Sequence, residues 1–127
     1  MKRTVFSDID GTLLNSEQRI TQKTKYALGE LKKNGIPFVI VSARSPGGIF
    51  SVMKDNGINC PIISFSGALI MDENRKILYQ NGFCKSDARR ILNYIESGSF
   101  DVAVNIYSPA RWITKDRSDP RIVREEQ

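Results

Sequence analysis

Two carboxylates separated by a single residue, Asp8 and Asp10, have the type and spacing that catalysis requires. They directly follow a short apolar run at residues 4–6. Two acids at this spacing point to the same side, so one can act as a nucleophile while the other transfers the proton of a leaving group and of water. A hard ion such as Mg²⁺, which binds through one or two carboxylates plus a substrate phosphate, relieves their mutual repulsion. The pair indicates metal-assisted phosphoryl chemistry.

Other groups nearby are suited to binding a phosphoryl group. Gly11 lets the chain bend back and aim amide N–H groups at phosphoryl oxygens. Ser42 follows the apolar run 37–41, and because neighbouring strands lie about 4.8 Å apart, its hydroxyl can reach the same pocket as Asp8. A helix that begins at Pro46 adds a favourable potential for an anion.

Two other interpretations of these residues are weighed against this one. A calcium loop counted from Asp8 fails, because its fifth, sixth and twelfth positions are Thr12, Leu13 and Arg19 instead of an acid, a glycine and a glutamate. A plain solvated turn stays open for the acidic pair. For Ser42, a strand-end hydroxyl that caps the next turn stays open beside the phosphate contact.

Composition excludes several classes of function. The chain has no histidine, so it has no Ser-His-Asp triad, no His-ligated zinc and no phosphohistidine relay. Cys60 and Cys84 lie far apart without a CxxC pair, which argues against a disulfide framework or a thiolate metal site.

The overall charge and hydropathy pattern point to a soluble chain. The net charge of +5 is spread along the sequence, which suits an anionic metabolite but not nucleic acid, since no arginine-rich run is interleaved with aromatic residues. No apolar run approaches the roughly 20 residues of a membrane span, and the N-terminus has no signal-peptide pattern. We therefore expect a cytoplasmic protein of 127 residues without a membrane partner.

The first two-thirds of the chain alternates between strand and helix patterns, which predicts an α/β fold. The run 37–41 lacks alternation, as is typical of a parallel strand covered on both faces. Ligands of such open sheets bind at the carboxyl ends of the strands, where the acidic pair and Ser42 lie. We predict strands at 4–6, 37–41 and 61–65, a hairpin of 68–71 with 76–80, and helices at 21–34, capped by Thr21, and 46–57, capped by Ser45.

The pattern changes near residue 85. We predict a helix there, capped by Ser86, because Ala88, Ile91, Leu92 and Ile95 follow helical spacing. A strand at 101–107 and a partner at 111–114 follow, and the charged tail from Lys115 is expected to fray.

Three motifs then support a family resemblance. Residues 8–14 (DIDGTLL), 39–44 (VIVSAR) and 62–68 (IISFSGA) resemble the N-terminal half of haloacid dehalogenase superfamily phosphatases of the Cof type. The likeness spans residue 3 to about residue 115, where 105–107 and Trp112 resemble the opening of that family's α/β cap. It implies a partial Rossmann-like, parallel-sheet core at 1–82 and the start of an incomplete α/β cap domain at 83–127.

The resemblance also implies roles for individual residues. Asp8 would be the nucleophile that forms an aspartyl-phosphate and Asp10 the general acid/base, with Mg²⁺ bound by the Asp8 carboxylate and the Asp10 carbonyl. The phosphoryl group would be bound by Gly11, Thr12, Ser42 and Ala43, and the mouth of the pocket lined by Arg44, Ser66 and Gly67. Family members commonly carry Asn at the position of Ser66 and Gly or Thr-Gly at 42–43, so the sequence departs from the family pattern at these positions.

The sequence departs from the family in its later part. Members run to roughly twice this length and supply a phosphate-binding lysine and further acids after the cap, and nothing after Trp112 matches these. We therefore expect a chain that stops inside the cap, has impaired activity, and exposes sheet edges that favour self-association or a complementing chain. Three hypotheses stay open: a Mg²⁺-dependent phosphatase for small phosphorylated metabolites, a non-catalytic fragment or assembly partner that at most binds Mg²⁺ or phosphate, and a phosphomutase.

Overall fold

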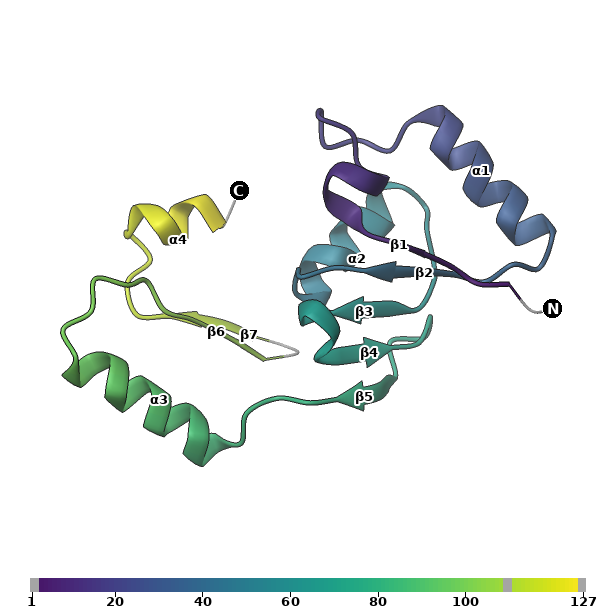
Figure 1. Cartoon of the computed structure of the whole chain (residues 1–127). Coiled ribbons are helices and arrows are strands. Elements are labelled where there is room, and N and C mark those ends of the chain that lie inside the picture. Colours follow the sequence, from purple (N-terminus) through teal and green to yellow (C-terminus); the bar gives the residue numbers. More distant parts are fainter. Residues whose placement is uncertain (1–2, 109–110, 126–127) are drawn as a thin grey trace. The chain divides into compact units, whose positions relative to one another are not determined.

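The computed structural model describes residues 3–108 and 111–125 (Figure 1). The chain divides into two compact units, Met1–Asn81 and Gly82–Gln127. The boundary predicted from the sequence falls one residue later, after residue 82. None of the described helices is long and apolar enough to cross a membrane.

The first unit is built on one mixed sheet. Its strands follow the spatial order β1-β2-β3-β4-β5; β1 to β3 are parallel, and β4 and β5 form the predicted antiparallel hairpin. This arrangement confirms the α/β fold class. The strands are β1 (Val5–Ser7), β2 (Phe38–Val41), β3 (Ile62–Ser64), β4 (Leu69–Met71) and β5 (Ile77–Gln80).

Two helices, α1 (Gln22–Lys33) and α2 (Pro46–Asp55), connect the parallel strands. Both begin as the sequence predicts. The Thr21 hydroxyl accepts a hydrogen bond from the amide of Thr24 at 3.2 Å, and the Ser45 hydroxyl accepts one from the amide of Gly48 at 3.4 Å. Side-chain caps of this kind satisfy amide groups that the first helical turn leaves unpaired.

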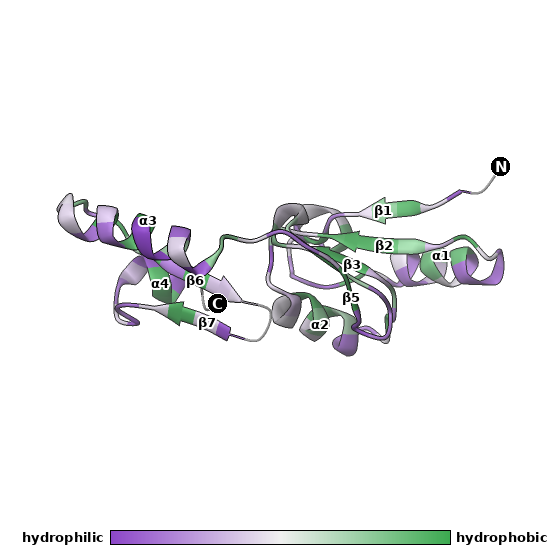
Figure 2. Ribbon diagram, turned by 90° about the horizontal axis from the view of Figure 1, so that it is seen from below, coloured by the Kyte–Doolittle hydropathy of each residue, from purple (hydrophilic) through white to green (hydrophobic). Residues whose placement is uncertain are grey.

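The core lies on the face of the sheet that the helices cover. Ile40 and Ile62, paired across β2 and β3, are fully buried and pack with Ile49 and Met53 of α2. Because both crossovers step in the same direction along the sheet, right-handed connections place both helices on this one face. Figure 2 shows the apolar strands of this unit in green.

The opposite face of the sheet has no helix in the described part of the first unit, although the sequence predicts β2 to be covered on both faces. Strand register places six apolar side chains on it, which we call the open face: Phe6, Val39, Val41, Ile63, Ile70 and Tyr79. Phe6 is 60% exposed and Tyr79 is 48% exposed. A sequence pattern reports which residues are apolar but not which layers are present to cover them.

The second unit contains α3 (Lys85–Ser97), an antiparallel pair of β6 (Asn105–Ser108) and β7 (Arg111–Thr114), and α4 (Pro120–Glu125). The N-cap of α3 is Cys84 and not Ser86, which lies inside the helix. The strand β6 begins at Asn105, four residues later than predicted.

The tail beyond Lys115 forms α4 where the sequence predicts fraying. Pro120 occupies the start of the helix, a position that proline favours. Ile122 is 1% exposed, and the Arg121 guanidinium pairs with Asp119 at 2.8 Å and Asp101 at 3.0 Å. One buried apolar side chain and this ion-pair network outweigh the polar composition on which the prediction of fraying rested.

Candidate active site

Asp10 lies on a wide turn, Ile9–Leu13, that follows β1, and Asp8 directly precedes this turn as its N-cap. Two hydrogen bonds close the turn: the amide of Leu13 donates to the Asp8 carbonyl at 3.2 Å, and the amide of Leu14 donates to the Ile9 carbonyl at 2.9 Å. Gly11 has a φ of +70°, so it supplies the bend that the sequence predicts. Ile9 and Leu13 are buried, whereas Asp8 and Asp10 are exposed to solvent.

Ser42 lies beside this turn at the end of the neighbouring strand. Ser7 is paired with Ile40, so continuation of the register brings Asp8 level with Val41. The Ser42 side chain is buried, and its hydroxyl oxygen accepts a hydrogen bond from the Arg44 amide at 3.1 Å. The hydroxyl therefore caps the turn, as one interpretation of the sequence holds, while its proton stays available as a donor.

The third loop of the site follows β3. Phe65, Ser66 and Gly67 all have positive φ angles, of 50°, 54° and 101°. The amide of Phe65 donates to the Arg44 carbonyl, and the amide of Ser66 donates to the Ser42 carbonyl, each at 3.2 Å. Non-glycine residues in this conformation persist only where their surroundings impose it. These two hydrogen bonds join the loop after β3 to the loop after β2.

Arg44 and Asp10 form a bidentate ion pair between the first two loops. Nη2 of Arg44 lies 2.6 Å from Oδ1 of Asp10, and Nε lies 2.9 Å from Oδ2. The side chains are 37% and 49% exposed. The hydrogen bond that Arg44 donates to Asp10 raises the pKa of Arg44, partial burial opposes that rise, and the charges of Asp10 and Asp8 add to it.

The structure therefore brings together most of the predicted site. Hydrogen bonds link Asp10 to Arg44, Arg44 to Ser42, and Ser42 to Ser66. No side-chain hydrogen bond joins Thr12 to this set within the described residues, and Gly11, Ala43 and Gly67 offer only main-chain groups. For Gly11, Thr12 and Ala43 the binding of a phosphoryl group stays a prediction, and so does the place of Gly67 at the mouth of the pocket.

Sequence reasoning missed the contact between Arg44 and Asp10 and the part played by Phe65. The sequence does contain a signal for the ion pair, because opposite charges that follow adjacent parallel strands lie close together at the carboxyl edge of the sheet. The conformation of Phe65 had none, since a positive φ at an aromatic residue has no local sequence signature.

The donor groups present fit Mg²⁺. The Asp8 carboxylate accepts no hydrogen bond from any described residue, and it is exposed. The described residues contain no cluster of three or more His, Cys, Asp or Glu side chains, which excludes a cage built from protein ligands alone in this part of the chain. Mg²⁺ needs only one or two carboxylates, since it retains water and binds substrate phosphate.

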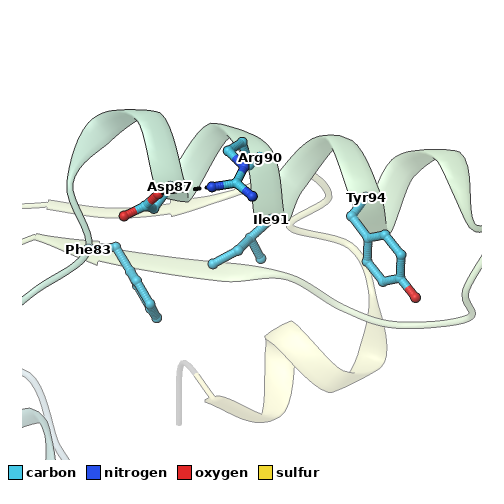
Figure 3. Close-up of a pocket in the computed structure, with 5 residues that line it drawn as sticks. All are labelled: Phe83, Asp87, Arg90, Ile91 and Tyr94. Carbon is cyan, nitrogen blue, oxygen red and sulfur yellow. Dashed lines mark ion pairs between the residues drawn. The ribbon is translucent and has the colours of Figure 1, made fainter.

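A hollow of about 480 Å³ lies in the second unit. Figure 3 shows Phe83, Ile91 and Tyr94 extending from the α3 side of this hollow, with Asp87 and Arg90 paired at 3.6 Å beside them. Its lining is mostly apolar side chains of one exposed helix face. Unlike the loops after β1 to β3, it has no converging set of polar groups of the kind that fixes a substrate.

Comparison with known proteins agrees with this geometry. The family model for haloacid dehalogenase-like hydrolases matches residues 5–127. The phosphatase YwpJ of Bacillus subtilis is 31% identical over 106 residues, covering 80% of this chain and 37% of that protein. A glucosyl-3-phosphoglycerate/mannosyl-3-phosphoglycerate phosphatase of Persephonella marina is 32% identical over 105 residues, covering 72% of this chain and 38% of that protein.

Comparison with solved structures also finds haloacid dehalogenase-like hydrolases. The structure of a haloacid dehalogenase-like hydrolase from B. subtilis superposes with a TM-score of 0.82 at 26% identity, covering 99% of this chain and 42% of that one. The chain thus spans well under half the length of these relatives. The match of nearly the whole sequence to the family model, together with the shared fold and the acidic turn after β1, establishes that the chain belongs to the haloacid dehalogenase-like hydrolase family.

Proposed function

We propose that this chain carries the nucleophile and the acid–base residue of a Mg²⁺-dependent phosphatase that acts on small phosphorylated metabolites through an aspartyl-phosphate. The observation that carries the proposal is the contrast between two acids on one turn. The Asp8 carboxylate is exposed and accepts no hydrogen bond from the described residues, whereas Asp10 is fixed by Arg44. A nucleophile has to be accessible, and a proton-transfer group has to be positioned.

In the proposed reaction an oxygen of Asp8 attacks phosphorus, and the bond from phosphorus to the leaving oxygen breaks as Asp10 donates a proton to that oxygen. Water then attacks the aspartyl-phosphate and gives its proton to Asp10, which releases phosphate and restores Asp8. The Ser42 hydroxyl and the amides of residues 11–12 and 43 bind the non-bridging oxygens. When bound by Asp8 and the Asp10 carbonyl, Mg²⁺ would neutralise charge on the phosphoryl group.

The proposed substrate class has two supports. The net charge of +5 favours an anionic ligand. The relative from Persephonella marina is named for the hydrolysis of sugar-linked phosphoglycerates, which are small phosphorylated molecules.

Hydrolysis of p-nitrophenyl phosphate by the full chain tests the proposal. We expect turnover that requires Mg²⁺ and that falls to background in Asp8→Asn, because an amide neither attacks phosphorus nor binds the ion as a carboxylate does. Asp55→Asn, which changes an exposed acid at the other end of α2, is the matched control and should leave turnover unchanged. Equal turnover in wild type and Asp8→Asn would exclude Asp8 as the nucleophile.

Calorimetric titration of the same chain with Mg²⁺ and beryllofluoride separates turnover from binding. The proposed enzyme binds both, with binding weakened in Asp8→Asn. Binding that depends on Asp8 without any turnover would instead support the non-catalytic alternative.

A further inference from the structure

We propose that Arg44 is a positioning residue that holds the carboxylate of Asp10 for proton transfer, and that it is not a ligand of the transferred phosphoryl group. This inference rests on the proposed function, in which Asp10 is the acid–base residue. It replaces the role at the mouth of the pocket that the family resemblance implies for Arg44.

The geometry of the ion pair favours this role. An arginine side chain makes two parallel hydrogen bonds to an oxyanion either side-on, through Nε and Nη2, or end-on, through Nη1 and Nη2. In this structure both bonds of the side-on edge go to Asp10, at 2.9 Å and 2.6 Å. The side-on edge is therefore occupied by the Asp10 carboxylate, and a phosphoryl group could bind there only by displacing Asp10.

The main chain of Arg44 is fixed on both sides of its side chain. Its amide donates to the Ser42 hydroxyl at 3.1 Å, and its carbonyl accepts from the Phe65 amide at 3.2 Å. The stem of the side chain lies beside Gly48, where an added Cβ would stand 3.7 Å from Cβ and 3.8 Å from Cδ of Arg44. Because its main chain is hydrogen-bonded and its aliphatic part lies against Gly48, the Arg44 side chain is held in place and can position Asp10.

Asp10 needs such a partner. Its side chain is half-exposed, and the structure gives its carboxylate no described hydrogen bonds other than the two from Arg44. Without them the carboxylate would move freely among its rotamers, and ordering a side chain during the reaction costs free energy.

Steady-state kinetics on the full chain separates positioning from substrate binding. With p-nitrophenyl phosphate and Mg²⁺, we expect both Arg44→Ala and Arg44→Lys to lower kcat by about ten- to a hundredfold, because a small misplacement of a catalytic group has effects of this size. KM should change by less than about twofold, since uniform substrate binding is not lost. Lysine should fail to restore kcat because its ammonium cannot form two parallel hydrogen bonds.

The matched control is Lys33→Ala. It removes an exposed ion pair of similar length, to Glu30 at 2.7 Å, in the last turn of α1. This control should leave kcat and KM unchanged. A higher KM with unchanged kcat in Arg44→Ala would make Arg44 a substrate contact and overturn the inference, and so would full kcat in Arg44→Lys.

A double-mutant cycle in urea tests the contact without using activity. Unfolding of wild type, Asp10→Ala, Arg44→Ala and the double variant should reveal a coupling of about two- to fivefold in the unfolding equilibrium constant. Additive effects would show that the pair is not held in solution and would overturn the inference. If wild type shows no turnover that depends on Asp8, the proposed function fails, while the cycle still decides whether Arg44 holds Asp10.

Discussion

The two acids of the turn after β1 are chemically identical but lie in different surroundings. Asp8 is exposed and accepts no hydrogen bond from the described residues, and Asp10 shares both of its oxygens with Arg44. Between and beyond them, Ile9 and Leu13 are buried in the core. Residue types alone cannot assign different tasks to two carboxylates, whereas a difference in their hydrogen bonding can.

The two cysteines should react at different rates. Burial raises the pKa of the Cys60 thiol to about 11 from its ordinary value of 9.0, against a smaller opposing effect of a hydrogen bond with the Ile40 backbone. Cys84 is exposed. At pH 8, Ellman's reagent should therefore label one thiol per native chain quickly and the second only in denaturant, and Cys84→Ser should remove the fast phase. Two equally fast thiols in native protein would contradict the buried position of Cys60.

The Cys60 thiol also makes the free energy of unfolding fall at high pH. Between pH 9 and about pH 11 the thiol ionises in the unfolded chain but stays protonated in the folded one. The unfolded state then binds fewer protons, so this contribution to stability falls as the pH rises through that window and is complete below it. Urea midpoints at pH 8 and pH 10 for wild type and Cys60→Ala would show it as a smaller pH effect in the variant.

At the candidate site, the sequence correctly predicts the features that follow from the local path of the backbone. Asp8 and Asp10 follow a strand, Gly11 has a positive φ, and Ser42 lies at the end of the next strand, all as expected from local patterns. The main chain of Arg44 depends instead on a hydrogen bond with Phe65, more than twenty residues further along the chain. A local pattern holds no information about such contacts.

Among the elements, helix starts show where local signals succeed and fail. Thr21 and Ser45 precede strong helix patterns and cap them. Ser86 precedes an equally clear apolar stripe, and a helix capped by Ser86 would begin at residue 87. The helix α3 instead begins at Lys85, with Cys84 as its N-cap. Several residues near a helix start can serve as the cap, and packing selects among them.

Comparing two hydroxyl deletions tests this difference. Thr21→Ala should lower the free energy of unfolding by about 1 kcal/mol, because the amide of Thr24 loses its acceptor. Ser86→Ala lies inside α3 and should change it by only a few tenths of a kcal/mol, since alanine is the better helix former. Urea denaturation of both variants is the measurement. A larger loss for Ser86→Ala would indicate that Ser86 caps the helix after all.

At the scale of the whole chain, the buried core is concentrated in one unit. Of the described hydrophobic residues that are buried, Ile122 alone belongs to the second unit. The first unit in turn has a helix layer on one face of its sheet and leaves the open face uncovered in its described part. Apolar surface of this kind favours association.

We propose that the open face mediates self-association of the isolated chain with a second copy. Sedimentation velocity should show a weight-average mass that rises with concentration. Phe6→Lys should weaken this association by about tenfold or more, because burying a large apolar side chain contributes about 1.5–3 kcal/mol. Tyr26→Lys is the control, since Tyr26 is 69% exposed but lies on α1. A monomer at all concentrations, or equal effects of both variants, would refute the proposal.

Because β1 is an edge strand of the described sheet, the described part of the first unit has a neighbouring strand on one flank of Asp8 only, and that strand leads into the loop after β2. Any polypeptide that paired in parallel with the free side of β1 would end its own strand about 5 Å from this carboxylate. Under the proposed function, a cation carried at the end of such a strand would lie beside the phosphoryl group on Asp8, and the site would be open to complementation in trans.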